Sequence, residues 1–299
     1  MKRPAVYLAS VFFTLLLIFT SLAAMAAGVA RFHALNTDTA LAIVRQQDLA
    51  ARVHTSLETE FRQRESTTGI PAEVYADAIT PEKLEPIISA TVSNGFAYVR
   101  GDTASLGVAP DFSGLEEAVQ QFFADYAAKE GVEKDETYNS AVRDTIAEAE
   151  EIIRKACDVY RFGNLNESGM MKQAKSYVPW LGAAVIALAA VSLVLIVILF
   201  TVNRREAEHG CYWTATALLI ASLLLLIPSA WLHYTRWFDR FAVKTDQTFA
   251  AVTGFLYSNT HTMIVTAAIA AAAAVLLYIL FAILHSVRRK REIVREAKH

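Results

Sequence analysis

Four long apolar runs divide the chain, at residues 4–30, 180–202, 212–231 and 263–285. None of them contains a lysine, arginine, aspartate or glutamate. A helix needs about 20 apolar residues to cross the hydrocarbon core of a bilayer, and each run reaches that length. The pattern therefore predicts a bundle of four transmembrane helices in an all-α protein.

The first run has two interpretations. Residues 24–26 (Ala-Met-Ala) fit the small-x-small pattern of a signal-peptide cleavage site. The apolar stretch is, however, longer than the ~7–15 residues of a signal-peptide core. Thr20, Ala24 and Gly28 also form a ridge of small residues, which is typical of helix packing in membranes. We interpret residues 1–30 as an uncleaved first span, with a signal peptide as the alternative.

Clusters of basic residues mark alternate ends of the apolar runs, at Lys2 and Arg3, Arg204 and Arg205, and Arg288 to Arg291. Such clusters are retained on the cytoplasmic side of a membrane. They predict a multi-pass protein of the bacterial plasma membrane with both termini in the cytoplasm. Residues 31–176 and 233–257 are then outside, residues 177–287 hold spans 2–4, and residues 288–299 form a basic cytoplasmic tail.

The segment from residue 31 to residue 176 has the periodicity of amphipathic helices rather than strands. One long helix is predicted by the spacing of Leu41, Val44, Leu49, Val53, Leu57 and Phe61. Further helix boundaries are indicated by Gly69, Thr80-Pro81, a capping box at Ser113 and Glu116, and Gly131. The glycines between Gly95 and Gly114 predict a long loop. We expect an all-helical extracytoplasmic domain of about five helices around one core, inserted between spans 1 and 2.

Residues 233–257 repeat aromatic side chains at helical spacing, with charged residues between them. The members include Trp237, Phe238 and Phe241. An amphipathic helix that lies on the outer membrane surface, or that docks under the extracytoplasmic domain, explains this pattern.

Charge is unevenly distributed although the net charge is only -2. Residues 31–176 hold 24 acidic and 15 basic residues, and the rest of the chain holds 6 acidic and 13 basic residues. An acidic soluble segment lacks the basic face that nucleic-acid binding needs. Nucleic acid is therefore excluded as an expected partner, whereas membrane lipids are expected.

Sequence motifs for catalysis are missing. The chain has no Gly-rich phosphate loop, no GxSxG elbow, no HExxH pair and no CxxC pair. His54 and Glu58 are spaced to share a metal, but a solvated side-chain pair is the ordinary outcome of that spacing. The spans also lack the ionisable groups that transporters place at mid-membrane depth. We therefore expect no enzyme activity, no cofactor, no metal and no stand-alone transport.

The remaining hypothesis is recognition at the outer face. Loops held by a rigid scaffold concentrate binding residues. The candidate interaction surface consists of Arg100, Asp102, Asp111, Trp237, Phe238 and Phe241. We expect this surface to bind a protein, peptide or envelope component in a binding, sensing or scaffold role. The small-residue face of Ala183, Ala187 and Ala190 is suited to contacts within a homo- or hetero-oligomer.

One span, a large outer domain and three further spans form a layout similar to the permease subunits of force-transmitting ABC systems, of the FtsX and MacB type. That resemblance implies the alternative function, a permease-like subunit working with a separate ATPase. The long helices next to spans 1 and 2 also resemble the helical sensor domains of chemotaxis receptors.

Overall fold

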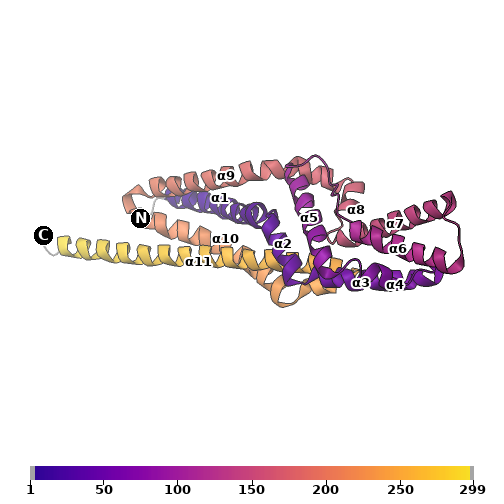
Figure 1. The fold of residues 1–299 in the computed structure, drawn as a ribbon. Helices are drawn as coiled ribbons and strands as arrows, with labels where there is room; N and C mark the ends of the chain where they lie inside the picture. The colour runs from indigo at the N-terminus through magenta and orange to yellow at the C-terminus, as the bar shows by residue number, and fades with distance from the viewer. Residues whose placement is uncertain (1–3, 297–299) are drawn as a thin grey trace. The chain divides into compact units, whose positions relative to one another are not determined.

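The computed structural model describes residues 4–296, with side chains described as far as Arg291. Helices and their connections account for all of this range, without a strand (Figure 1). Four helical segments are long and apolar enough to cross a membrane: Pro4–Ala34, Met170–Val202, Arg204–Tyr234 and Asp246–Arg291. The predicted all-α fold with four candidate transmembrane helices is confirmed at this level.

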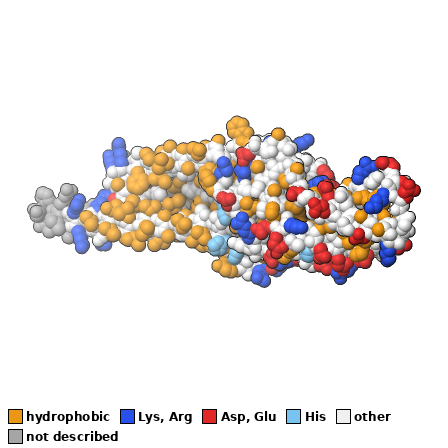
Figure 2. All heavy atoms as spheres, viewed as in Figure 1, with side chains coloured by type: hydrophobic (Ala, Val, Ile, Leu, Met, Phe, Trp, Pro, Cys, Tyr) orange, Lys and Arg blue, Asp and Glu red, His pale blue; other side chains and the backbone are white. Residues whose placement is uncertain are grey.

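The chain forms two compact units. The apolar unit consists of the described residues up to Leu35, Pro179–Arg240, and the residues from Leu256 on. The polar unit consists of Asn36–Val178 together with Phe241–Phe255. Figure 2 shows hydrophobic side chains over the visible face of the apolar unit and acidic and basic side chains over that of the polar unit. The units divide the chain differently from the predicted domains, because residues 241–255 join residues 36–178.

The apolar unit contains α1 (Pro4–Val29), which continues into a π-helical turn, η1 (Ala30–Ala34). It also contains a 3₁₀ turn η2 (Arg204–Glu206), α10 (Ala207–Tyr234) and a 3₁₀ turn η3 (Trp237–Arg240). Two further helices belong to it in part: α9 (Met170–Val202) from Pro179 on, and α11 (Asp246–Glu296) from Leu256 on. Its core combines large and small side chains, namely Leu17, Ile18, Leu195, Leu199, Ala217 and Ala221. Alanines at such positions let helix backbones approach closely. Ala183, Ala187 and Ala190 are exposed instead.

The polar unit contains α2 (Thr37–Gln46), α3 (Leu49–Thr68), α4 (Ala72–Ala76), α5 (Pro81–Arg100), α6 (Ser113–Glu130), α7 (Glu136–Cys157) and α8 (Phe162–Glu167). One hydrophobic cluster joins these helices to the start of α11. Its fully buried members include Leu49, Leu57, Leu84, Ile88, Leu115, Ile153 and, from α11, Ala251. Burial of apolar surface on this scale is the main stabilising term of a folded unit.

Three helices of the polar unit end at a glycine, and two of these ends, at Gly69 and Gly131, were predicted from the sequence. Gly69, Gly101 and Gly131 all adopt the left-handed conformation, with φ of 71°, 85° and 68°, at the ends of α3, α5 and α6. Glycine enters this region without the steric cost that a Cβ atom adds. Thr80 precedes α5 and Pro81 begins it, as the sequence predicts.

Three local predictions were wrong. The helix expected across residues 41–61 is two helices, because Asp48 adopts a left-handed conformation with φ of 48° between α2 and α3. The capping box does not form, because Ser113 is the first residue of α6 and Phe112 is its N-cap; the Ser113 backbone N–H donates instead to the Asp111 carboxylate. The long loop begins at Gly101 rather than Gly95, which lies buried within α5.

The predicted amphipathic helix over residues 233–257 was also wrong as a single element. Arg236 adopts a left-handed conformation with φ of 50° beyond the end of α10, and η3 follows it. Asp246 then lies in the first turn of α11, where a carboxylate favours the helix dipole. The aromatic residues of this segment therefore belong to three elements rather than to one face.

Candidate functional site

The polar unit contains a cavity of about 490 Å³, which we call the loop pocket. It lies between the first half of α5 and the residues that lead into α6. Most of the lining is apolar, consisting of Ala78, Ile79, Leu84, Pro86, Ile87, Ala90, Val108, Ala109, Pro110, Phe112, Gly114 and Leu115. The polar side chains are Lys83, Asp111 and Ser113. A mainly apolar cavity of ~300–1,000 Å³ with a few polar groups is typical of a binding site.

Side chains from neighbouring helices hold the loop between α5 and α6 in place. Asn94 Nδ2 donates to the carbonyl oxygens of Ser105 and Gly107, at 3.2 Å each. Lys175 Nζ donates to the carbonyl oxygen of Thr103 at 2.7 Å. The same ammonium lies 4.3 Å from the centre of the Tyr98 ring, a cation–π contact. The loop is therefore tied to α5 and to the first turns of α9.

Two charged side chains of the loop pocket have local roles. The Asp111 carboxylate accepts a hydrogen bond from the Ser113 backbone N–H at 3.0 Å, which lowers the pKa of Asp111 below its ordinary value. Lys83 Nζ donates to the carbonyl oxygen of Ala78 at 2.9 Å. The Lys83 ammonium and the Asp111 carboxylate are both exposed, and they border the apolar lining of the loop pocket.

The six predicted surface residues are divided between the two units. Asp111 alone among them lines the loop pocket. Arg100 bonds to Asp102 at 2.7 Å and to the Thr37 hydroxyl at 2.7 Å, so its guanidinium joins the end of α5 to the start of α2. Arg100 and Asp102 are therefore brought together, but in a structural contact.

The three aromatic residues of the prediction are divided between the units. Trp237 belongs to the apolar unit, where its ring lies 5.1 Å from Trp231 and 4.8 Å from the Arg240 guanidinium carbon. Phe238 is buried in the same unit against Tyr257. Phe241 is 41% exposed and begins the segment assigned to the polar unit. That these three rings share a surface stays a prediction.

Sequence reasoning missed the α5 side of the loop pocket. Lys83, Pro86, Ile87 and Ala90 line it. The available signal was the width of the apolar pattern on α5: Pro86 and Ala90 lie outside the stripe that Leu84, Ile88 and Val92 bury. An amphipathic helix normally has polar residues outside its core stripe, so apolar residues at Pro86 and Ala90 indicate that a second surface of α5 contacts another part of the chain or a partner.

His54 and Glu58, which are spaced to share a metal, each contact another group instead. The His54 imidazole lies 3.3 Å from the Ala76 carbonyl oxygen, and Glu58 pairs with Arg62 at 2.7 Å. Among the described side chains, no group of three His, Cys, Asp or Glu residues is placed to share a metal ion. Cys157 is a free, fully buried cysteine, and burial raises its pKa to about 12.

Comparison with protein-family models, with curated proteins and with solved structures finds no match for this chain.

Proposed function

We propose that the chain is an integral plasma-membrane protein whose polar unit lies outside the cell and binds a protein, peptide or envelope component through the loop pocket. The observation that carries this proposal is a mainly apolar cavity of about 490 Å³, bordered by a loop that Asn94 and Lys175 hold in place. A site that is already ordered loses little conformational entropy when a partner binds.

The composition of the polar unit supports the proposed arrangement across the membrane. Residues 36–178 and 241–255 form one unit and must lie on the same side of the membrane. The chain between them contains two candidate spans, in α9 and α10, and two crossings return it to the side it left. The basic clusters at Arg204–Arg205 and Arg288–Arg291 are then both cytoplasmic, as the positive-inside rule requires.

Site-specific photo-crosslinking in intact cells tests the binding site. A photoreactive residue at Ala90, which is exposed and lines the loop pocket, should give a discrete adduct identifiable by mass spectrometry. The same residue at Ala128, exposed on α6 outside the pocket, is the matched control. Adducts of equal yield at both positions, or none at Ala90, would contradict the proposal.

A second candidate function is the permease-like subunit working with a separate ATPase. The observation that favours it is the continuity of α11, whose first ten residues belong to the polar unit and whose remainder belongs to the apolar unit. One unbroken helix is a suitable element for passing a displacement from one unit to the other. Co-purification of an ATPase with the chain in mild detergent would favour this function over a binding module.

A further inference from the structure

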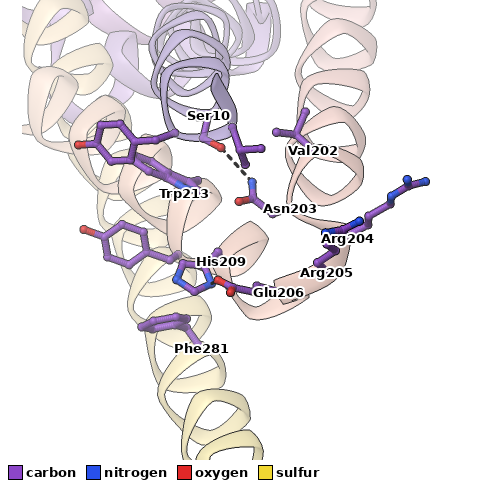
Figure 3. Close-up of a pocket in the computed structure, with 12 residues that line it drawn as sticks. Ser10, Val202, Asn203, Arg204, Arg205, Glu206, His209, Trp213 and Phe281 are labelled. Carbon is purple, nitrogen blue, oxygen red and sulfur yellow. Dashed lines mark hydrogen bonds and ion pairs between the residues drawn. The ribbon is translucent and has the colours of Figure 1, made fainter. Parts of the chain in front are cut away.

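The apolar unit contains a cavity of about 640 Å³ at the end that carries Arg204 and Arg205, and we call it the turn cavity (Figure 3). It lies beside the first turns of α1, the turn between α9 and α10, and one residue of α11. Its wall contains four aromatic side chains, Tyr7, Tyr212, Trp213 and Phe281. Its polar lining contains Ser10, Asn203, Arg204, Arg205, Glu206 and His209. The volume is in the range of ~300–1,000 Å³ that is usual for ligand sites.

Hydrogen bonds and ring contacts give the turn cavity a defined shape. Asn203 Nδ2 donates to the Ser10 hydroxyl at 3.0 Å and to the Leu199 carbonyl oxygen at 2.8 Å, and both side chains are buried. Figure 3 shows the Asn203 amide turned toward Ser10. The Trp213 ring lies 5.6 Å from that of Tyr7, edge to face. These contacts hold α9 and α10 against the start of α1.

The charges at this cavity do not cancel. Arg288 of α11 bonds to Glu208 at 2.8 Å and lies 3.7 Å from Glu206, so both carboxylates already face a cation. Arg204 and Arg205 are exposed, and neither has an ion-pair partner among the described side chains. In Figure 3 their side chains extend outward from the turn, away from the Phe281 side of the cavity. The mouth of the cavity therefore carries two uncompensated positive charges.

The cavity lies where the apolar surface of the spans gives way to basic residues. Tyr7 and Leu8 of α1 are 55% and 72% exposed, and they continue the apolar surface next to the cavity wall. Aromatic rings with an apolar body and a polar end are typical of the headgroup level of a bilayer. Cations at this level attract anionic lipid headgroups. A small free anion would not use the aromatic wall, and a neutral lipid would not use the two arginines.

We propose that the turn cavity binds one anionic phospholipid. Its phosphate would lie between the guanidinium groups of Arg204 and Arg205 at the mouth. The glycerol region would face Asn203, and the first part of the acyl chains would pack on Tyr7 and Trp213. This site is separate from the loop pocket, so it does not depend on the function proposed for the polar unit.

Native mass spectrometry of the full-length protein, titrated with phosphatidylglycerol in detergent micelles, tests the site. The wild-type protein should bind one lipid more tightly than those that follow. R204Q/R205Q should weaken this first binding step by about tenfold or more, given the usual contribution of a basic residue near a lipid surface. The matched control R289Q/K290Q removes two charges from exposed residues that do not line the cavity, and it should leave the first step unchanged.

A second variant keeps every charge and fills the space instead. Val6 lines the cavity and is partly exposed, so V6W should occupy the cavity and abolish the tight binding step while both arginines remain. This variant decides the matter if R204Q/R205Q fails to insert or fold. Equal losses in R204Q/R205Q and R289Q/K290Q would show diffuse attraction and overturn the proposal, as would wild-type binding by V6W. Displacement of the lipid by millimolar inorganic phosphate would assign the site to free phosphate and would also overturn it.

Discussion

At the scale of single residues, the polar unit depends on an aromatic cluster formed by Phe96, Tyr160, Phe162 and Phe255. The Phe96 ring lies 5.7 Å from Phe162 and 6.0 Å from both Tyr160 and Phe255. Burial raises the pKa of Tyr160 well above its ordinary value, so the phenol stays neutral in the physiological range. The cluster joins α5, the α7–α8 connection and α11 around one point.

Gly95 provides the space for the Phe162 ring. A Cβ atom at Gly95 would lie 2.3 Å from two ring carbons of Phe162. G95A should therefore destabilise the protein by up to about 2 kcal/mol, since overpacking costs ~1–3 kcal/mol and the better helix propensity of alanine returns ~1 kcal/mol. Thermal unfolding of the full-length protein in detergent measures the change.

The control for this prediction is G107A, because nothing lies within 4 Å of a Cβ atom at Gly107. It should change stability by less than about 0.5 kcal/mol. In the F162L background, where the ring is removed, G95A should cost much less than it does in the wild-type protein. A stabilising effect of G95A in the wild-type protein would show that Phe162 can move aside freely.

At the scale of elements, an aspartate accepts a backbone hydrogen bond at the start of both α6 and α7. Asp135 Oδ1 accepts from the Tyr138 backbone N–H at 2.8 Å, and Asp111 Oδ1 accepts from the Ser113 backbone N–H at 3.0 Å. Each carboxylate satisfies a backbone donor that has no partner within its helix. The hydrogen bond to Asp111 also sets the position of residues 108–112, which border the loop pocket.

D111A should lower the melting temperature at pH 7, and the difference should vanish in acid. The hydrogen bond from Ser113 lowers the pKa of Asp111 in the folded state below its unfolded value of ~3.9. A depressed pKa contributes stability that is fully present above the unfolded pKa and is lost as the pH falls through the folded pKa. Melting curves of wild-type protein and D111A should therefore begin to approach each other as the pH falls below about 4, and they should converge only below the folded pKa of Asp111.

D135A is the matched control for the position of the substitution, because it removes an aspartate that accepts a backbone hydrogen bond at the start of a different helix. It should cost about 1 kcal/mol at pH 7 through the loss of the α7 cap. The residues of the loop pocket should be undisturbed, because α7 does not line it. If the destabilisation by D111A were the same at every pH, Asp111 would act through packing rather than through its charge.

At the scale of the whole molecule, the polar unit is assembled from two distant parts of the chain. Arg52 pairs with Asp246 at 2.6 Å, Arg161 donates to the Thr245 hydroxyl at 3.2 Å, and Gln247 donates to the Ser56 hydroxyl at 3.3 Å. Ala251 is fully buried in the same hydrophobic cluster as α3 and α5. The start of α11 therefore completes the core that residues 36–178 begin.

Residues 36–178 expressed alone should be less stable than the same segment joined by a flexible linker to residues 241–255. Full burial of a phenylalanine side chain is worth ~1.5–3 kcal/mol, and Phe255, which is partly buried against the core, contributes a part of this. Each kcal/mol shifts the melting temperature of such a unit by about 2–4 °C. Circular dichroism melts measure the difference. A linked segment with A251D should behave like residues 36–178 alone, because it places a carboxylate at a fully buried position. Equal melting temperatures for all three proteins would show that α11 adds nothing to the core.

The proposed arrangement across the membrane has its own test, in a protein with both cysteines changed to serine. Single cysteines at Asp102 and Lys244, which are exposed, should react with an impermeant maleimide added to intact cells. Cysteines at Arg204 and Lys290 should react only after the cells are opened. Labelling of R204C in intact cells would exclude the four-span arrangement.

The sequence by itself determined the properties that depend on a few neighbouring residues. The four apolar runs became the four candidate spans because length and polarity alone decide whether a helix can cross a bilayer. Gly69 and Gly131 end their helices because the left-handed conformation suits glycine wherever it occurs.

Only the tertiary structure decided which distant segments share a surface. Arg236 adopts a left-handed conformation that arginine does not favour, so the surrounding packing must stabilise that break. Aspartate tolerates this conformation better, but Asp48 lies inside a continuous apolar repeat that does not mark the break. The loop pocket forms because residues 108–115 lie against α5, and the turn cavity forms because α1 lies against α10. Residues 241–255 contain apolar residues at helical spacing, and three of them, Ala250, Ala251 and Phe255, pack in the core of the polar unit. Helical spacing predicts that such a face is buried, but it does not identify the part of the chain that buries it.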